Sequence, residues 1–232
     1  MLRRKEDIYI DKTLFVSMLR RCLMTIFSEM ILMVSGTYMT ALFNSREGAD
    51  VVSGMASSFA IANLFFVAFS GVNTAIGVLL GKMMGHGELK QARDEKSKLL
   101  MAALLFGVSM GFVGMMTVFL IPVVFGSLSS SAQTICRQMV SGIALFMPIM
   151  VYVNAQYAVS RAGGDTISLM FVDGVTTILL ILIGILFTTK YTQLGPVAMY
   201  MICRCVDFIR IILAGILLKK ERWLRNLTRE DC

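Results

Sequence analysis

Charged residues are scarce in this chain. They make up 16% of its 232 residues, whereas a soluble domain carries about 25%. Hydrophobic residues make up 56% and the mean hydropathy is +0.74. The apolar residues also come in long blocks, and a block of about 20 crosses a bilayer as a helix. The shortage of charge therefore argues against a soluble domain and predicts an all-α membrane protein.

Signatures of common catalytic and metal sites are missing as well. No G-x-S-x-G, H-E-x-x-H or phosphate-loop motif occurs, so nothing in the sequence supports an enzyme. The single histidine, His86, lies in a charged segment where we expect it to be solvated. Cys203 and Cys205 lack a second cysteine pair or a nearby histidine, so we interpret them as small buried residues. We expect no metal site and no cofactor other than a coupling ion.

Six apolar blocks are long enough to be transmembrane helices. We place them at 22–43, 52–81, 99–121, 138–160, 167–188 and 196–218. Residues 1–21 are mostly polar, which does not suit a secretory signal, and 219–232 form a basic tail. The second helix, continued to Gly85, exceeds the ~30 Å of hydrocarbon, so it should tilt, kink or project. Glycines spaced by four predict close helix packing: Gly77, Gly81, Gly85, Gly107 and Gly111.

The distribution of lysine and arginine predicts the orientation. Seventeen basic residues fall on the side that holds both termini and the charged 82–98 segment, which we take to be a loop. Three fall on the other side, namely Arg46, Arg137 and Lys190. Because basic residues stay cytoplasmic, we expect both termini to be cytoplasmic and the protein to be integral to the plasma membrane. The positive charge then lies beside anionic lipid, and we expect no nucleic-acid partner.

Several polar side chains fall inside the predicted helices. Charge is costly in hydrocarbon and usually faces a bundle interior or a water-filled cavity. Glu29, in "MTIFSEMILMV", lies about 10 Å below the cytoplasmic boundary, and its own span offers it no basic partner. The depths of this carboxylate and three other groups converge on one layer, which we interpret as an ion-coupling and solute site. The others are Asp173, Asn73 and Asn154.

Other residues near this layer complete the candidate site. Asp207 lies deeper, with Arg204 and Arg210 three residues away on either side. Pro148 should kink its helix near Tyr152, a further candidate for the cleft. The alternative is that each polar group is satisfied separately, Asp207 by an arginine and the amides by interhelical hydrogen bonds.

The short turn "RAGGDT", residues 161–166, introduces a resemblance. Gly163 and Gly164 allow a tight reversal after Arg161, and Asp165 can cap the next helix. Three segments together resemble the multidrug and toxic compound extrusion family, in order along nearly the whole chain. They are "SGVNTAIGVLLGKMMGHGELKQA", the turn "RAGGDT" and "KKERWLRNLT". The resemblance implies twelve helices in two lobes, with this chain as the C-terminal lobe. It also implies export of organic, often cationic compounds in exchange for Na⁺ or H⁺.

The resemblance also suggests roles for individual residues. Glu29 matches an acidic residue common in the first helix of that lobe, which would couple transport by binding a proton, a cation or a cationic solute in turn. The acidic residue that one branch carries in the fourth helix is missing from "MPIMVYVNAQYAVS", where Asn154 offers only a neutral oxygen. Asp173 could take its place.

Alternating access needs two bundles, so we expect a second six-helix lobe as partner, besides membrane lipid and a small organic substrate. The chain could be a split or truncated half, or could pair with itself. Two other functions stay open: a six-helix substrate-binding module with a separate energising partner, and a lobe of a lipid-linked sugar flippase, for which a basic cleft is expected.

Overall fold

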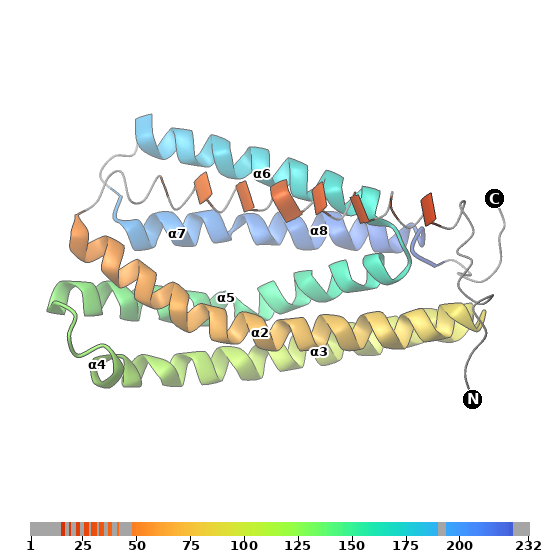
Figure 1. Cartoon of the computed structure of the whole chain (residues 1–232), viewed down its shortest axis with the longest axis horizontal. Helices are drawn as coiled ribbons and strands as arrows, with labels where there is room; N and C mark the ends of the chain where they lie inside the picture. The colour runs from red at the N-terminus through yellow and green to blue at the C-terminus, as the bar shows by residue number, and fades with distance from the viewer. Residues whose placement is uncertain are drawn as a thin grey trace, which may run out of the picture.

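The computed structural model describes residues 48–189 and 194–224, together with scattered helical residues between 15 and 41. The described residues form helices and turns, which confirms the predicted all-α architecture. The predicted span 22–43 and the terminal segments lie largely outside the described residues. The helices run roughly parallel along the long axis of the molecule in Figure 1, in this order: α2 (Ala49–Gly85), α3 (Leu89–Thr117), η2 (Val118–Leu120), α4 (Ile121–Val124), α5 (Ser130–Ala162), α6 (Thr166–Thr189), α7 (Pro196–Arg204) and α8 (Val206–Lys219).

The membrane character of the helices follows from their length and surface. Four helical segments, beginning at Ala49, Leu89, Ser130 and Thr166, are long and apolar enough to cross a bilayer. In the second of these segments, which begins at Leu89, large apolar side chains point outward and are exposed in the isolated chain, among them Leu105, Phe112 and Phe119. Such a surface suits lipid, and the protein is an integral membrane protein.

The segment 82–98 is not the loop that we predicted. α2 continues to Gly85 and α3 already begins at Leu89, so the turn consists of His86, Gly87 and Glu88. Lysine, arginine, glutamate and glutamine favour helices, which lets the charged stretch "LKQARDEKSK" extend α3 beyond the apolar block. His86 is exposed, and its Nδ1 lies 2.9 Å from the Lys82 carbonyl oxygen. At 37 residues, α2 is about 55 Å long.

α5 is the central helix, packed against both α2 and α3. A Cβ added at Gly107 would lie 2.8 Å from Pro148 Cα, and one at Gly111 would lie 2.8 Å from the Ala144 carbonyl oxygen. This oxygen is the acceptor left without an α-helical partner by Pro148, which has no N–H. The predicted close packing is therefore confirmed on α3. It is not seen on α2, where a Cβ added at Gly77, Gly81 or Gly85 would meet no described atom within 4 Å.

The sixth predicted span, 196–218, is divided into α7 and α8 at Cys205. Arg204 is the last residue of α7 and Asp207 lies in the first turn of α8. A cation at the C-terminal end of a helix and an anion at an N-terminal end are both favoured by the helix dipole. α8 packs against α5 and α6, and so holds these charges inside the bundle.

The α5–α6 turn is held by the residues that follow α8. Gly164 has a φ of 74°, and the N–H groups of Gly164 and Asp165 donate to the carbonyls of Arg161 and Ser160. This pattern is a Schellman motif, which needs a left-handed residue at the position of Gly164. The Asp165 carboxylate makes no hydrogen bond within the described part of the chain, so the backbone closes the turn where we expected a side-chain cap.

The backbone of Trp223 lies against Gly163 in this turn, and the Trp223 side chain is 1% exposed. Its Nε1 donates to the Leu218 carbonyl oxygen over 3.2 Å, and the Lys96 ammonium lies 5.5 Å from the ring centroid. A Cβ added at Gly163 would lie 1.8 Å from the Trp223 carbonyl oxygen. An ion pair between Arg93 and Glu221 joins the same tail to α3. The tail therefore ties together one end of α3, α5 and α8.

Candidate functional site

A polar cavity of about 420 Å³ lies between α2 and α5. Each helix contributes a stripe of residues at positions i, i+3, i+4 and i+7, which is one face of a helix. α2 contributes Ser70, Asn73, Thr74 and Gly77, and α5 contributes Asn154, Tyr157, Ala158, Arg161 and Ala162. The cavity has the size of a site for a small organic molecule.

The two amides that we predicted for the cleft both line this cavity. Asn154 Nδ2 donates to the Met150 carbonyl oxygen over 2.8 Å, and the described residues offer its amide oxygen no hydrogen bond. Asn73 makes no hydrogen bond among the described residues either. Tyr152, our third cleft candidate, does not line the cavity, because a residue two positions from Asn154 faces another side of the helix. It packs at the edge of the main apolar core instead.

Glu29 forms an ion pair with Arg161 at the wall of the cavity. The Arg161 Nη2 and the Glu29 Oε1 are 2.5 Å apart, and the two side chains are 37% and 47% exposed. The sequence offers Glu29 no basic residue nearby, but the fold supplies one from the far end of α5, 132 positions away. Arg161 is also the charged residue among those lining the cavity, and no acidic side chain lines it within the described residues.

Tyr157 connects the cavity to a second group of polar residues. Its ring lines the cavity, and its hydroxyl donates to Asp173 Oδ1 on α6 over 2.8 Å. Asp173 is fully buried and lies in the interior of the bundle rather than at the cavity wall. Sequence reasoning overlooked Tyr157, although its position three residues after Asn154 places it on the same helical face.

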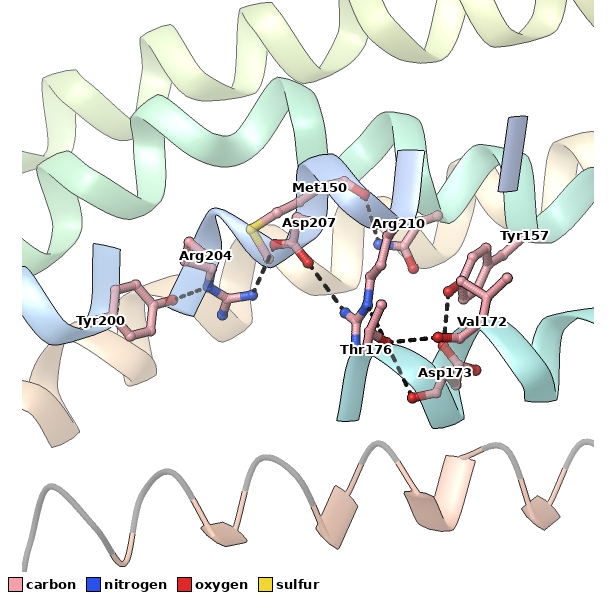
Figure 2. Close-up of polar contacts among 10 residues, drawn as sticks. Met150, Tyr157, Val172, Asp173, Thr176, Tyr200, Arg204, Asp207 and Arg210 are labelled. Carbon is pink, nitrogen blue, oxygen red and sulfur yellow. Dashed lines mark hydrogen bonds and ion pairs between the residues drawn. The ribbon is translucent and has the colours of Figure 1, made fainter. Parts of the chain in front are cut away.

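A chain of polar contacts continues from Asp173 across α6 to α8 (Figure 2). Thr176, one turn after Asp173, accepts a hydrogen bond from Arg210 Nε over 3.1 Å. Arg210 Nη1 donates in turn to Asp207 Oδ1 over 3.2 Å. Arg204 Nη1 lies 3.5 Å from Asp207 Oδ2, too far for a hydrogen bond but close enough for an ion pair.

The charges of this chain of contacts balance. It holds two acidic residues, Asp173 and Asp207, and two basic residues, Arg204 and Arg210, so their formal charges are equal and opposite. Asp207 lies between both arginines and forms an ion pair with each. This arrangement is the alternative to a coupling role for Asp207 that the sequence analysis named. A balanced, hydrogen-bonded set is how charge is accommodated in a membrane interior.

The described residues contain no group of three or more His, Cys, Asp or Glu side chains that could hold a metal ion. Cys203 is buried as we expected, whereas Cys205 is exposed, so our interpretation of Cys205 as a buried residue is wrong.

A bundle of membrane-length helices with ion pairs in its interior and a polar cavity between two of its helices suits a membrane transporter. The sequence model of the MatE family matches residues 25–187, and the chain belongs to this family. Members of this family are transporters rather than enzymes. The family resemblance stated from the sequence motifs is thereby confirmed.

A solved structure has the same fold. It is the structure of a MOP superfamily transporter from Pyrococcus furiosus Vc1 (DSM3638), for which a reverse polarity of the binding pocket is said to suggest a different function. The TM-score is 0.77 at 13% sequence identity, with 89% of this chain and 45% of that chain covered. The chain thus spans about half the length of that transporter. Comparison with curated protein sequences gives no match.

Proposed function

We propose that the chain is the C-terminal six-helix lobe of an antiporter that exports organic compounds with a cationic group in exchange for Na⁺ or H⁺. The observation that carries this proposal is the Glu29–Arg161 ion pair at the wall of the polar cavity. The fold and the MatE match support a transporter. The ion pair adds a carboxylate whose partner can be exchanged.

The exchange works through competition for the Glu29 carboxylate. Arg161 occupies it in the structure, and a proton, a Na⁺ ion or a cationic solute can each take the place of Arg161. Two ligands that compete for one carboxylate cannot be bound together, so the entry of one drives out the other. The amides of Asn73 and Asn154 supply neutral hydrogen-bonding groups that hold the rest of the solute.

Asp173 and Asp207 are the other two carboxylates that the sequence suggested for ion coupling. In the structure each already has a partner, Asp173 in Tyr157 of α5 and Asp207 in Arg204 of α7 and Arg210 of its own helix. We therefore propose that Glu29 exchanges ions directly, and that Asp173 acts on the cavity through Tyr157.

A second six-helix lobe is part of the proposal. Alternating access rocks one bundle against another around a central site, and this chain corresponds to 45% of the matched transporter. The partner would be an N-terminal lobe, with both termini of the present chain on the cytoplasmic side. Expressed alone, the chain should insert in the membrane without exporting solute.

Arg161 favours one alternative, a lobe of a lipid-linked sugar flippase. Such a function calls for a cationic group that binds an anionic head group, and Arg161 lines the cavity. Its pairing with Glu29 cancels this charge in the structure, which is why we place export first.

Ion-driven efflux from vesicles that contain both lobes tests the proposal. Glu29→Gln keeps the shape of the side chain but can neither exchange a proton nor offer a negative charge. We expect it to abolish both pH-driven and Na⁺-driven efflux at normal protein levels. Glu221→Gln is the matched control, because Glu221 also pairs with an arginine between two elements and is 38% exposed. Normal driven efflux by Glu29→Gln would refute the coupling role.

A further inference from the structure

We propose that Trp223 is a positioning residue for the Glu29–Arg161 ion pair. The backbone of Trp223 fixes the last turn of α5, and this turn includes Arg161. The inference rests on the proposed function, because it takes the pair to be the coupling site. It goes further by giving the tail after α8 a part in keeping Arg161 within reach of Glu29.

The tail meets α5 through its backbone at Gly163, the residue that ends the helix. A Cβ added at Gly163 would lie 1.8 Å from the Trp223 carbonyl oxygen, so there is no room for a side chain between the two segments. The Gly163 N–H donates to the Val159 carbonyl oxygen over 3.3 Å, which makes Gly163 part of the turn that holds Arg161. A contact between two backbones has no rotamers through which it can relax. The end of α5 therefore cannot move toward the tail, and it loses this stop when the tail leaves.

The tail is itself fixed by the buried ring of Trp223. This side chain is 1% exposed, its Nε1 donates to the Leu218 carbonyl oxygen of α8 over 3.2 Å, and the Lys96 ammonium of α3 lies 5.5 Å from the ring centroid. The start of α3 and the ends of α5 and α8 lie at the same end of the bundle (Figure 1). The ion pair between Arg93 and Glu221 adds little, because its side chains are 53% and 38% exposed. The ring therefore holds the end of α5 in place relative to two other helices.

The backbone just before Trp223 indicates that tertiary contacts impose the path of the tail. Glu221 has a φ of 53°, in the left-handed region that a residue with a Cβ rarely adopts. Such a conformation persists where the surrounding structure determines it. The Leu224 N–H donates to the Glu221 carbonyl oxygen over 2.9 Å and closes this turn around Trp223. The chain thus adopts a disfavoured conformation where it brings Trp223 back against α5.

The ion pair needs this support because it is exposed. The side chains of Arg161 and Glu29 are 37% and 47% exposed, and the two residues lie 132 positions apart. Holding two long side chains in one geometry costs rotamer entropy, so an exposed pair is favoured over the open form by a factor of only about 1.5 to 5. A guanidinium on a fixed backbone stays within reach of its partner, whereas the end of an unsupported helix frays. Releasing the tail should therefore open the pair and leave Glu29 to the ions that compete with Arg161.

The Arg161 guanidinium reports the state of the pair by NMR. The purified chain is labelled with ¹⁵N-arginine and measured in lipid nanodiscs, and the Arg161 Nε–H signal is assigned by its absence in Arg161→Lys. In the parent, Glu29→Gln should shift this signal, because it removes the negative partner. In Trp223→Ala, the same substitution should shift it by about half as much or less, because Arg161 no longer stays at Glu29. An equal shift in the two backgrounds, or no shift in the parent, would overturn the inference.

Further variants separate positioning from a general loss of stability. Gly163→Ala acts on the same contact from the side of α5 and should reduce the shift as Trp223→Ala does. Trp223→Leu keeps apolar bulk, should also reduce the shift, and takes the place of Trp223→Ala where that variant does not fold. Glu221→Gln and Arg222→Gln change exposed parts of the tail and should keep the full shift. Gly111→Ala destabilises the α3–α5 contact elsewhere and should also keep it. A shift reduced as much in Gly111→Ala as in Trp223→Ala would overturn the inference, because any loss of stability would then open the pair.

The NMR assay and the efflux assay fail independently. If Glu29→Gln abolishes driven efflux but Trp223→Ala leaves the shift intact, the coupling proposal stands and the positioning inference is wrong. If Trp223→Ala reduces the shift but Glu29→Gln transports normally, Trp223 positions Arg161 and the coupling proposal is wrong.

Discussion

Replacing Gly163 by alanine should release the tail from the α5–α6 turn. The added Cβ would lie 1.8 Å from the carbonyl oxygen of Trp223 and 2.5 Å from its carbonyl carbon and Cα. All three are backbone atoms, so no change of side-chain rotamer relieves the clash. The tail must move away from α5, and the Trp223 ring, now 1% exposed, must leave its site or tilt out of it.

The expected loss of stability follows from the burial of this ring. A tryptophan side chain buries about 200 Å², which at ~25 cal/mol per Å² corresponds to about 5 kcal/mol as an upper bound. Losing a buried tryptophan typically costs about 3–5 kcal/mol. We therefore expect Gly163→Ala to lower the free energy of unfolding by about 3 kcal/mol or more.

Tryptophan fluorescence reports the position of Trp223 directly, because the chain contains one tryptophan. Gly163→Ala should shift the fluorescence emission to the red and make it accessible to acrylamide. Two alanine variants serve as controls. Gly164→Ala strains a residue with a φ of 74° and should cost about 1–2 kcal/mol with little change in emission. Gly81→Ala adds a Cβ in open space within α2, so it should leave the emission unchanged and raise stability by up to about 1 kcal/mol through helix propensity. Unchanged emission and quenching in Gly163→Ala would refute this account of the tail.

Further predictions concern the bundle interior and the topology. Asp207→Asn should destabilise the protein by about 3 kcal/mol, because it leaves Arg204 and Arg210 without their counterion. In thermal unfolding, adding Arg210→Gln should restore part of the lost stability, and equal stability of Asp207→Asn and the parent would contradict this. Gly111→Ala should lower the melting temperature, since its Cβ would lie 2.8 Å from the Ala144 carbonyl oxygen. A melting temperature as high as that of Gly81→Ala would argue against tight α3–α5 packing. On intact cells, an impermeant thiol reagent should label a cysteine at position 46 but not one at position 90, and the reverse pattern would invert the proposed orientation.

The helices themselves could be predicted from the sequence, because hydrocarbon leaves a chain few alternatives to helix. The apolar blocks 138–160 and 167–188 lie inside α5 and α6, which extend beyond them by a few residues at most ends. Helix ends outside the membrane were less predictable, since hydropathy does not mark them. α3 begins at Leu89, ten residues before the predicted span, because its charged residues are good helix formers.

The site could be predicted only where its contacts are local. Arg204, Asp207 and Arg210 lie three residues apart, and the two ion pairs among them follow directly from helical spacing. Asn154 and Tyr157 share a helical face by the same rule, which also removes Tyr152 from the cavity. The contact between Glu29 and Arg161 spans 132 positions, and no local pattern indicates it. It depends on where the end of α5 lies relative to Glu29.

A charge exchange between Glu29 and Arg161 tests most directly whether the two act as a pair. Driven efflux is measured in the two-lobe assembly for Glu29→Arg, for Arg161→Glu and for the double variant. Each single variant places two like charges where the structure has an ion pair and should abolish driven efflux. The double variant restores the ion pair with its polarity reversed, and we predict that it recovers a measurable part of the activity. A double variant as inactive as either single one, with normal folding and protein levels, would contradict the paired mechanism.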